Sequence, residues 1–341
     1  MGFSGIGVMG DFWKVVREFN PEGIEREAAE PLDFWMLGEP ESGRHTLAGS
    51  ILGVEAQSEL GTMFRLFDMG ENPDPVPIGE RPDLLVVVVR LDTEMAALGK
   101  QVSAAVNRVR VPTLLAMTHA DSTRVTREVR NGVFRTFSSV SYMRTVFLDA
   151  RDRAEVQAKL VPLMLEAVPN LRTPIARRIP AARTVVAEQI ITETSKVNAQ
   201  FALMANLPAN LPLFGGVAGS IADFFVLTKN QVMMVLRLAA VYGRDVAMTR
   251  GLMAEMAPVI GNAFMWRSAA RMAVGMLPTF VAAIPKAGIA YAGTYTVGQA
   301  ARFYYEHGRK PSGDLMKKFN LEGARLYRRN LGQRAGEPPQ P

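Results

Sequence analysis

The fold is decided by one stretch of the sequence, Leu32-Asp33-Phe34-Trp35-Met36-Leu37-Gly38-Glu39-Pro40-Glu41-Ser42-Gly43-Arg44-His45-Thr46. It predicts an apolar strand, a glycine-bracketed loop and the start of a helix. Gly38 and Gly43 have the spacing of a phosphate-binding loop, G-x-x-x-x-G-K-[ST]. Such a loop binds phosphate because backbone N–H groups and a helix N-terminus both face the anion. The glycine pair therefore predicts a phosphate site directly after the first strand.

Two chemically important positions of this loop are altered. Arg44 replaces the lysine, and its planar guanidinium can neutralise phosphate without being equivalent to an ammonium. His45 replaces the hydroxyl that binds Mg²⁺, a metal that prefers oxygen ligands. Thr46 could supply a hydroxyl only if the loop is re-registered. The sequence thus favours phosphate binding over hydrolysis, and a tight turn that binds nothing stays open. The candidate loop residues are Gly38, Ser42, Gly43, Arg44, His45 and Thr46.

Residues 31–168 alternate short apolar segments with amphipathic ones, which is typical of an α/β fold. Residues 84–89 are apolar at every position, as in a strand buried on both faces of a parallel sheet. We therefore expect an α/β doubly wound, P-loop-like domain that binds ligands at the carboxyl ends of its strands. The expected strands are 32–37, 62–68, 83–91, 113–118 and 145–150. The expected helices are 44–52, 94–108, 122–134 and 153–166.

No strand pattern follows residue 168, so we expect an all-α helical C-terminal domain over residues 185–330. A junction rich in Pro and Arg, residues 169–184, precedes it. The ends are predicted to be a helical extension, residues 1–30, and a disordered tail, residues 331–341. The expected helices are 185–205, 216–228, 231–242, 248–257, 263–277, 287–306 and 313–329.

Residues 272–301 contain one charge, Lys286, and are long enough to suggest a membrane span. Pro278 and Pro285 divide them, and neither piece reaches ~18 apolar residues. Small residues at every fourth position predict a smooth face for close helix packing. That face consists of Gly288, Ala292 and Thr296. A buried helical hairpin and membrane insertion or docking both stay open.

Composition limits the function classes. The chain has 341 residues, 48% hydrophobic and 21% charged, which predicts two domains with sizeable cores. The absence of cysteine excludes disulfides, thiolate metal sites and cysteine nucleophiles. Three histidines argue against a multi-histidine metal site.

The charge is unevenly distributed along the chain. Residues 1–168 hold 18 Lys/Arg and 24 Asp/Glu, whereas residues 169–341 hold 21 and 9, so their net charges are −6 and +12. The basic half predicts a membrane surface or anionic lipid as partner. Nucleic acid is disfavoured because no aromatic residues are interleaved with the cations. Mutual attraction of the two halves is the alternative, and a protein partner and self-association stay open. The arginines expected around a lipid contact are Arg177, Arg178, Arg183 and Arg302.

A second motif follows an apolar strand: Thr118-His119-Ala120-Asp121. It is similar to the [NT]-K-x-D motif with which small GTPases recognise guanine. There the aspartate accepts hydrogen bonds from the base and the lysine stem covers it. Thr118 and Asp121 match, and His119 replaces the lysine. The alternative is that Asp121 caps a helix over residues 122–134.

With both motifs in place, residues 32–168 resemble a degenerate Era/Ras-like P-loop GTPase domain. Two further elements depart from that family: Asp68-Met69-Gly70 is offset from D-x-x-G, and Asp149-Ala150-Arg151 keeps only the alanine of S-A-K. The resemblance implies GTP or GDP as ligand. The substitutions at Arg44 and His45 argue against Mg²⁺ binding and hydrolysis.

Residues 215–234, with the sequence GGVAGSIADFFVLTKNQVMM, resemble the signature of the YcjF-type domain that often follows GTPase modules in bacteria. Residues 238–243 and 290–298 continue the likeness, which covers about 180–308. It implies nucleotide-linked regulation and membrane association, at the cytoplasmic face of the inner membrane or otherwise as a membrane-associated cytoplasmic protein.

The same segment contains polar residues inside predicted apolar helices: Asp223, Asn230 and Gln231. A buried carboxylate is costly unless it is partnered, and Lys229, Arg237 and Arg271 are the expected candidates. These residues predict either a switchable polar seam or, as the favoured alternative, a hydrogen-bond lock between helices.

The sequence thus predicts a GTPase-like or pseudo-GTPase regulator, in which weak guanine-nucleotide binding is coupled to a membrane-associated helical domain. One alternative is a non-catalytic interaction or scaffold module that binds no nucleotide. Another is a membrane-remodelling or transport-linked protein.

Overall fold

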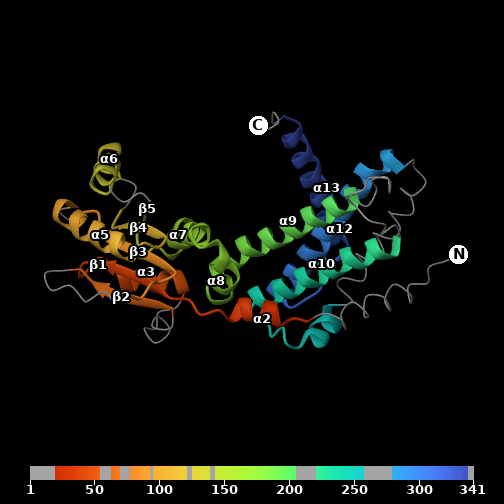
Figure 1. Ribbon diagram of the computed structural model, residues 1–341, viewed down its shortest axis with the longest axis horizontal. Helices are drawn as coiled ribbons and strands as arrows, with labels where there is room; N and C mark the ends of the chain where they lie inside the picture. The colour runs from red at the N-terminus through yellow and green to blue at the C-terminus, as the bar shows by residue number, and fades with distance from the viewer. Residues whose placement is uncertain are drawn as a thin grey trace. The chain divides into compact units, whose positions relative to one another are not determined.

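The structure is a computed structural model that describes residues 20–53, 63–69, 77, 79–92, 95–120, 125–138, 143–204, 220–256 and 279–336. The chain divides into two compact units (Figure 1). The first, called the α/β unit below, is Glu27–Val185. The second, called the helical unit, combines Met1–Arg26 with Val186–Pro341.

The α/β unit is built on a five-stranded parallel sheet with the order β2-β1-β3-β4-β5. Its strands are β1 Phe34–Gly38, β2 Phe64–Asp68, β3 Leu84–Arg90, β4 Thr113–Thr118 and β5 Met143–Phe147. The prediction of five strands in an α/β pattern is confirmed. β4 has the predicted bounds, and β5 lies slightly earlier in the chain than the predicted 145–150.

Helices cover both faces of the sheet (Figure 1). They are α3 Arg44–Leu52, α5 Met95–Val109, α6 Arg127–Thr136 and α7 Arg153–Ala167. On one face Leu37, Val87 and Leu115 pack in a core with residues of α5 and α6. The alternate strand residues, such as Met36 and Val86, are fully buried on the face contacted by α3 and α7. This strand order with two covered faces is characteristic of doubly wound sheets, whose ligands bind at the carboxyl ends of the strands.

The start of α6 corrects one prediction. The helix was expected over residues 122–134, but it begins at Arg127 because the Thr126 side chain accepts a hydrogen bond from the Val129 amide and acts as N-cap. Asp121 therefore does not cap this helix. Asp121 itself lies outside the described residues.

The Pro/Arg junction, residues 169–184, is helical rather than a separate linker. It folds as a 3₁₀ turn, Pro169–Leu171, the short helix α8 Arg172–Arg178 and the start of α9 Pro180–Met204. Proline is tolerated in the first turn of a helix, so α9 begins at Pro180 and not at the predicted residue 185. Arg178 and Arg183 donate hydrogen bonds to carbonyl groups of α8.

The described helices of the helical unit are α9 from Val186 onward, α10 Ser220–Val241, a helix over residues 249–256, α12 Thr279–His307 and α13 Gly313–Gly336. Two predictions are wrong here. The expected break between residues 228 and 231 is absent because α10 is continuous. The expected disordered tail, residues 331–341, is helical as far as Gly336. The predicted helix 263–277, residues 1–19 and residues 337–341 lie outside the described part of the chain.

The small-residue face of α12 packs against α13, as its spacing predicted. Gly288 lies under the ring of Tyr327, and Gly323 of α13 lies directly against the backbone of Ala292. Residues 290–301 of α12 are all buried. Among the residues that the structure describes, no helix combines the length and apolar character that a membrane crossing requires.

Candidate functional site

A cavity of about 240 Å³ opens at the carboxyl edge of the sheet. The residues that line it come from the loop after β1 with the start of α3, from the end of β4, and from the turn after β5. They are Glu41, Gly43, Arg44, His45, Thr46, His119, Asp149, Ala150 and Arg151. The structure therefore brings together most of the residues that the sequence singled out, at the edge where parallel sheets bind ligands.

The backbone of the Gly38–Gly43 loop turns sharply ahead of α3, and the Ser42 amide donates to the Glu39 carbonyl oxygen within it. Glu41 and Gly43 have positive φ angles of 62° and 87°, so the loop curls through two left-handed residues into a concave turn of the kind that binds anions. Gly43 is the N-cap of α3 and supplies no side-chain cap. Gly38 is required sterically, because a Cβ there would lie 2.4 Å from the Val88 carbonyl oxygen.

Arg44 is turned toward the end of β2. Its guanidinium donates a hydrogen bond to the Phe67 carbonyl oxygen and lies 3.6 Å from the Asp68 carboxylate. The Arg44 side chain is only 10% exposed. The cation at the lysine position is thus paired within the protein. The sequence singled out Asp68 only as part of the offset Asp68-Met69-Gly70 element, and its pairing with Arg44 was not predicted.

Thr118 has a structural role that its motif did not reveal. Its hydroxyl is fully buried and donates to the Ser42 carbonyl oxygen at 2.8 Å, with the Val89 carbonyl oxygen at 3.3 Å. This contact joins the end of β4 to the loop after β1. Ser42 is also buried, with 1% of its surface exposed. Thr118 and Ser42 therefore fix the loop and do not face the cavity.

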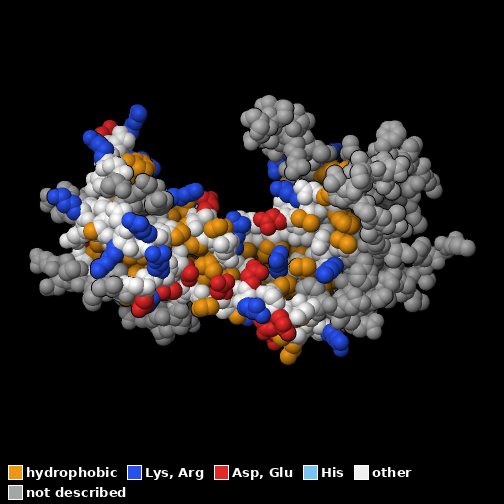
Figure 2. All heavy atoms as spheres, in the orientation of Figure 1, with side chains coloured by type: hydrophobic (Ala, Val, Ile, Leu, Met, Phe, Trp, Pro, Cys, Tyr) orange, Lys and Arg blue, Asp and Glu red, His pale blue; other side chains and the backbone are white. Residues whose placement is uncertain are grey.

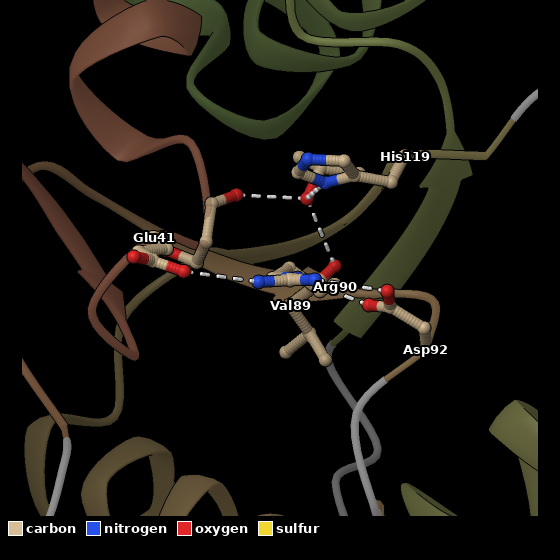
Figure 3. A network of polar contacts seen from close by, with 7 residues as sticks. Glu41, Val89, Arg90, Asp92 and His119 are labelled. Carbon is tan, nitrogen blue, oxygen red and sulfur yellow. Dashed lines mark hydrogen bonds and ion pairs between the residues drawn. The ribbon is translucent and has the colours of Figure 1, made fainter.

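Arg90 adds a second connection to the loop. Its guanidinium reaches Glu41 at 3.4 Å and Asp92 at 2.9 Å (Figure 3). The hydrogen bond from Arg90 holds the pKa of Asp92 below its ordinary value. Together with the Thr118 hydroxyl, this network holds the loop from two sides.

The groups that face the cavity are of mixed charge. His45 and Thr46 are exposed on the first turn of α3, and Arg151 is exposed beyond β5. His119 is half-buried, has a positive φ of 55°, and its Nδ1 lies 3.3 Å from the Thr118 hydroxyl. Asp149 accepts a hydrogen bond from the Arg151 amide. Imidazole and guanidinium donors beside exposed backbone amides form a site suited to a small anion.

No group of three or more acidic or histidine side chains capable of holding a metal ion occurs among the described residues. Asp121, the expected base-recognition residue, lies outside them.

The polar residues of α10 form a hydrogen-bond network with α9 and α12. Asn230 donates to Asn198 at 2.8 Å, Asn198 donates to Thr294 at 2.9 Å, and Gln231 donates to the same hydroxyl at 3.1 Å. Asn198 and Thr294 are fully buried and were not predicted as partners. This supports a hydrogen-bond lock between helices. Asp223 lies in α10, but its side chain is outside the described part.

A comparison of the chain with protein-family models and with curated proteins gives no match in either case.

Proposed function

We propose that the α/β unit is a regulatory, pseudo-GTPase-like module that binds a phosphate-bearing ligand, a guanine nucleotide, weakly and without hydrolysing it. The observation that supports weak binding without hydrolysis most directly is the pairing of Arg44 with Asp68 and the Phe67 carbonyl oxygen. This pairing engages the basic residue of the loop within the protein, at the end of the neighbouring strand, so an incoming phosphate must compete for it.

Anion binding is supported by three features of the cavity. The left-handed residues Glu41 and Gly43 curl the loop ahead of α3, and helix N-termini favour negative charge. His45, His119 and Arg151 provide further donors around it. The Thr118 hydroxyl also anchors the loop, and a loop fixed in this way loses less conformational entropy when a ligand binds.

The same geometry argues against metal-assisted hydrolysis. Phosphoryl transfer depends on Mg²⁺ held by a loop hydroxyl and a carboxylate, with a lysine on the outer phosphates. Here His45 offers no hydroxyl, and the positive charge of Arg44 already neutralises Asp68. We therefore expect ligand binding that is independent of Mg²⁺.

The guanine preference has a separate basis in the Thr118-His119-Ala120-Asp121 sequence. The buried Thr118 hydroxyl contacts the loop, so base recognition is assigned to Asp121, with the His119 imidazole positioned at the cavity to cover the base. Coupling of this module to a membrane-associated helical unit is part of the same proposal, as the resemblance of residues 215–234 implies.

The test is a titration of the full chain with labelled GTP, GDP and ATP, with and without Mg²⁺. We expect weak binding, tighter for guanine than for adenine, unchanged by Mg²⁺, and without turnover. The double variant Arg44→Lys, His45→Ser restores the ammonium and the hydroxyl, and we expect it to bind more tightly only when Mg²⁺ is present. Arg108→Ala, an exposed change at the end of α5, is the control.

Two results would contradict the proposal. Turnover comparable to that of ordinary GTPases would exclude a pseudo-GTPase. The absence of any nucleotide binding at millimolar concentration would favour the second candidate, an interaction or scaffold module that binds no nucleotide. A specific observation supports that candidate: the cavity of about 240 Å³ is smaller than the ~300 Å³ at which small-molecule pockets begin.

A further inference from the structure

Among the described residues of the helical unit, the outer face of α13 and the turn before it form the most basic exposed segment. Residues 307–329 hold seven Lys/Arg and two Asp/Glu. The exposed cations, called the α13 basic face below, are Arg309, Lys310, Lys317, Lys318, Arg325, Arg328 and Arg329. Leu321 lies among them and is 58% exposed. The spacing from Lys317 through Leu321 and Arg325 to Arg328 places these four side chains on one side of the helix.

The opposite side of α13 packs against α12 within the helical unit. Gly323 lies against the Ala292 backbone, Tyr327 covers Gly288, and α12 and α13 are in extensive contact. This packing fixes which side of α13 faces solvent. The α13 basic face is therefore a fixed surface of the folded unit.

Three of the four arginines that were predicted around a lipid contact make hydrogen bonds or ion pairs within the protein. Arg302 pairs with Glu188 and Glu306, and it is 19% exposed. Arg178 and Arg183 donate to backbone carbonyl groups within the α/β unit. The excess positive charge of the helical unit is concentrated instead on residues 307–329.

We propose that the α13 basic face docks on an anionic lipid surface, with the cations on the headgroups and Leu321 inserted between them. Exposed Lys/Arg around an exposed apolar side chain is the chemistry of a helix that lies in the membrane interface. A nucleic-acid surface fits less well, because bases stack on exposed aromatic rings and the Tyr327 ring is packed on Gly288. This inference rests on the membrane association in the proposed function and names the surface that would carry it, whereas nucleotide binding is tested by a separate experiment.

The test is flotation of the full chain with vesicles of phosphatidylcholine alone and with added phosphatidylserine, over a salt series. We expect binding only to the anionic vesicles, with partial release by salt. The triple variant Lys318→Glu, Arg325→Glu, Arg328→Glu is expected to lower the partition coefficient by at least roughly 100-fold, about fivefold for each cation removed. The milder triple change of the same residues to Gln keeps the test valid if charge reversal perturbs folding.

The single variant Leu321→Ser tests the apolar contribution. It keeps the cations but lacks the inserted side chain, so we expect salt to release it completely from the anionic vesicles.

A matched control separates this face from net charge. Over the α/β unit, Figure 2 shows Lys and Arg side chains interspersed with Asp and Glu. The control triple Lys100→Glu, Arg108→Glu, Arg127→Glu changes exposed cations of that unit by the same total charge, and we expect near-normal vesicle binding.

Three outcomes would overturn the inference. An equal loss of vesicle binding in the α13 triple variant and in the control triple variant would mean that binding depends on the overall charge of the chain. Equal binding to neutral and anionic vesicles would exclude recognition by charge. Tighter binding to duplex or single-stranded nucleic acid than to anionic vesicles, abolished by the α13 triple, would reassign the face to nucleic acid.

Discussion

Arg44 and Asp68 form the ion pair that decides how the cavity treats an incoming anion. The guanidinium lies at the motif's lysine position but is bound to the end of β2, so Asp68 competes with any phosphate for it. A carboxylate this close to the loop also repels an anion directly. Asp68 therefore lowers anion affinity in two ways.

We expect Asp68→Asn to strengthen nucleotide and pyrophosphate binding by about fivefold, which corresponds to roughly 1 kcal/mol for one unit charge removed nearby at an intermediate effective dielectric constant. Isothermal titration calorimetry of both forms of the protein measures the two dissociation constants. Glu166→Gln removes one negative charge from an exposed residue of α7 and is the control, with no change expected. Weaker binding in Asp68→Asn would mean that Arg44 needs Asp68 to be positioned for the ligand.

The sequence located the cavity residues better than it assigned their roles. Gly38 and Gly43 were predicted from spacing, since the need for glycine is a backbone property visible in a motif. Thr118 and Ser42 were predicted as ligand contacts. Both are buried instead, and the Thr118 hydroxyl donates to the Ser42 carbonyl oxygen. Which way a hydroxyl at a strand end points depends on the neighbouring loop, and sequence spacing contains no such information.

Helix and strand bounds were also predicted well only where they depend on local sequence signals. The bounds of α3 and β4 were predicted correctly because a glycine-to-helix switch and a bounded apolar run are local signals. Separate helices were expected over residues 216–228 and 231–242, but α10 runs through residues 229 and 230. Asn230 instead donates to Asn198 of α9, so a contact distant in sequence satisfies the polar group and the helix continues.

The α12–α13 contact gives a sharp test of packing. A Cβ on Gly323 would lie 3.0 Å from the Ala292 Cα and 3.1 Å from the Tyr295 Cβ, whereas a Cβ on Gly251 would meet nothing within 4 Å. We expect Gly323→Ala to destabilise the helical unit by about 1–2 kcal/mol through overpacking. Gly251→Ala, the same change in an open helical position, should be neutral or stabilising by up to ~1 kcal/mol. Denaturant unfolding measures both. Equal effects would mean that α13 does not pack closely on α12.

At the scale of the whole molecule, the two units have separate cores and different means of stabilisation. The α/β unit buries its strands on both faces, whereas the helical unit combines apolar helix packing with polar and ionic links. Compact units with their own cores generally unfold as separate cooperative transitions. A condition that weakens the polar and ionic contacts of one unit should therefore lower the unfolding temperature of that unit and leave the unfolding temperature of the other unchanged.

Acid is such a condition for the helical unit. Burial opposes ionisation of Glu306, but hydrogen bonds from Tyr242 and Arg302 outweigh it and hold the pKa of Glu306 below its ordinary value. A carboxyl whose pKa is lowered by folding stabilises the fold above its unfolded pKa, near 4.3, and this contribution disappears as the pH falls through the lower folded value.

We therefore expect calorimetry to show the transition of the helical unit moving to lower temperature as the pH falls below about 4.3, the unfolded pKa of a glutamate. Glu306→Gln cannot titrate, so it should lower the stability of this unit at neutral pH and flatten its pH dependence in the acid range. Asp314→Asn, a change at an 88% exposed side chain, is the control, since exposed ion pairs contribute little. An unchanged acid slope in Glu306→Gln would mean that the Tyr242–Glu306–Arg302 contacts do not couple protonation to folding.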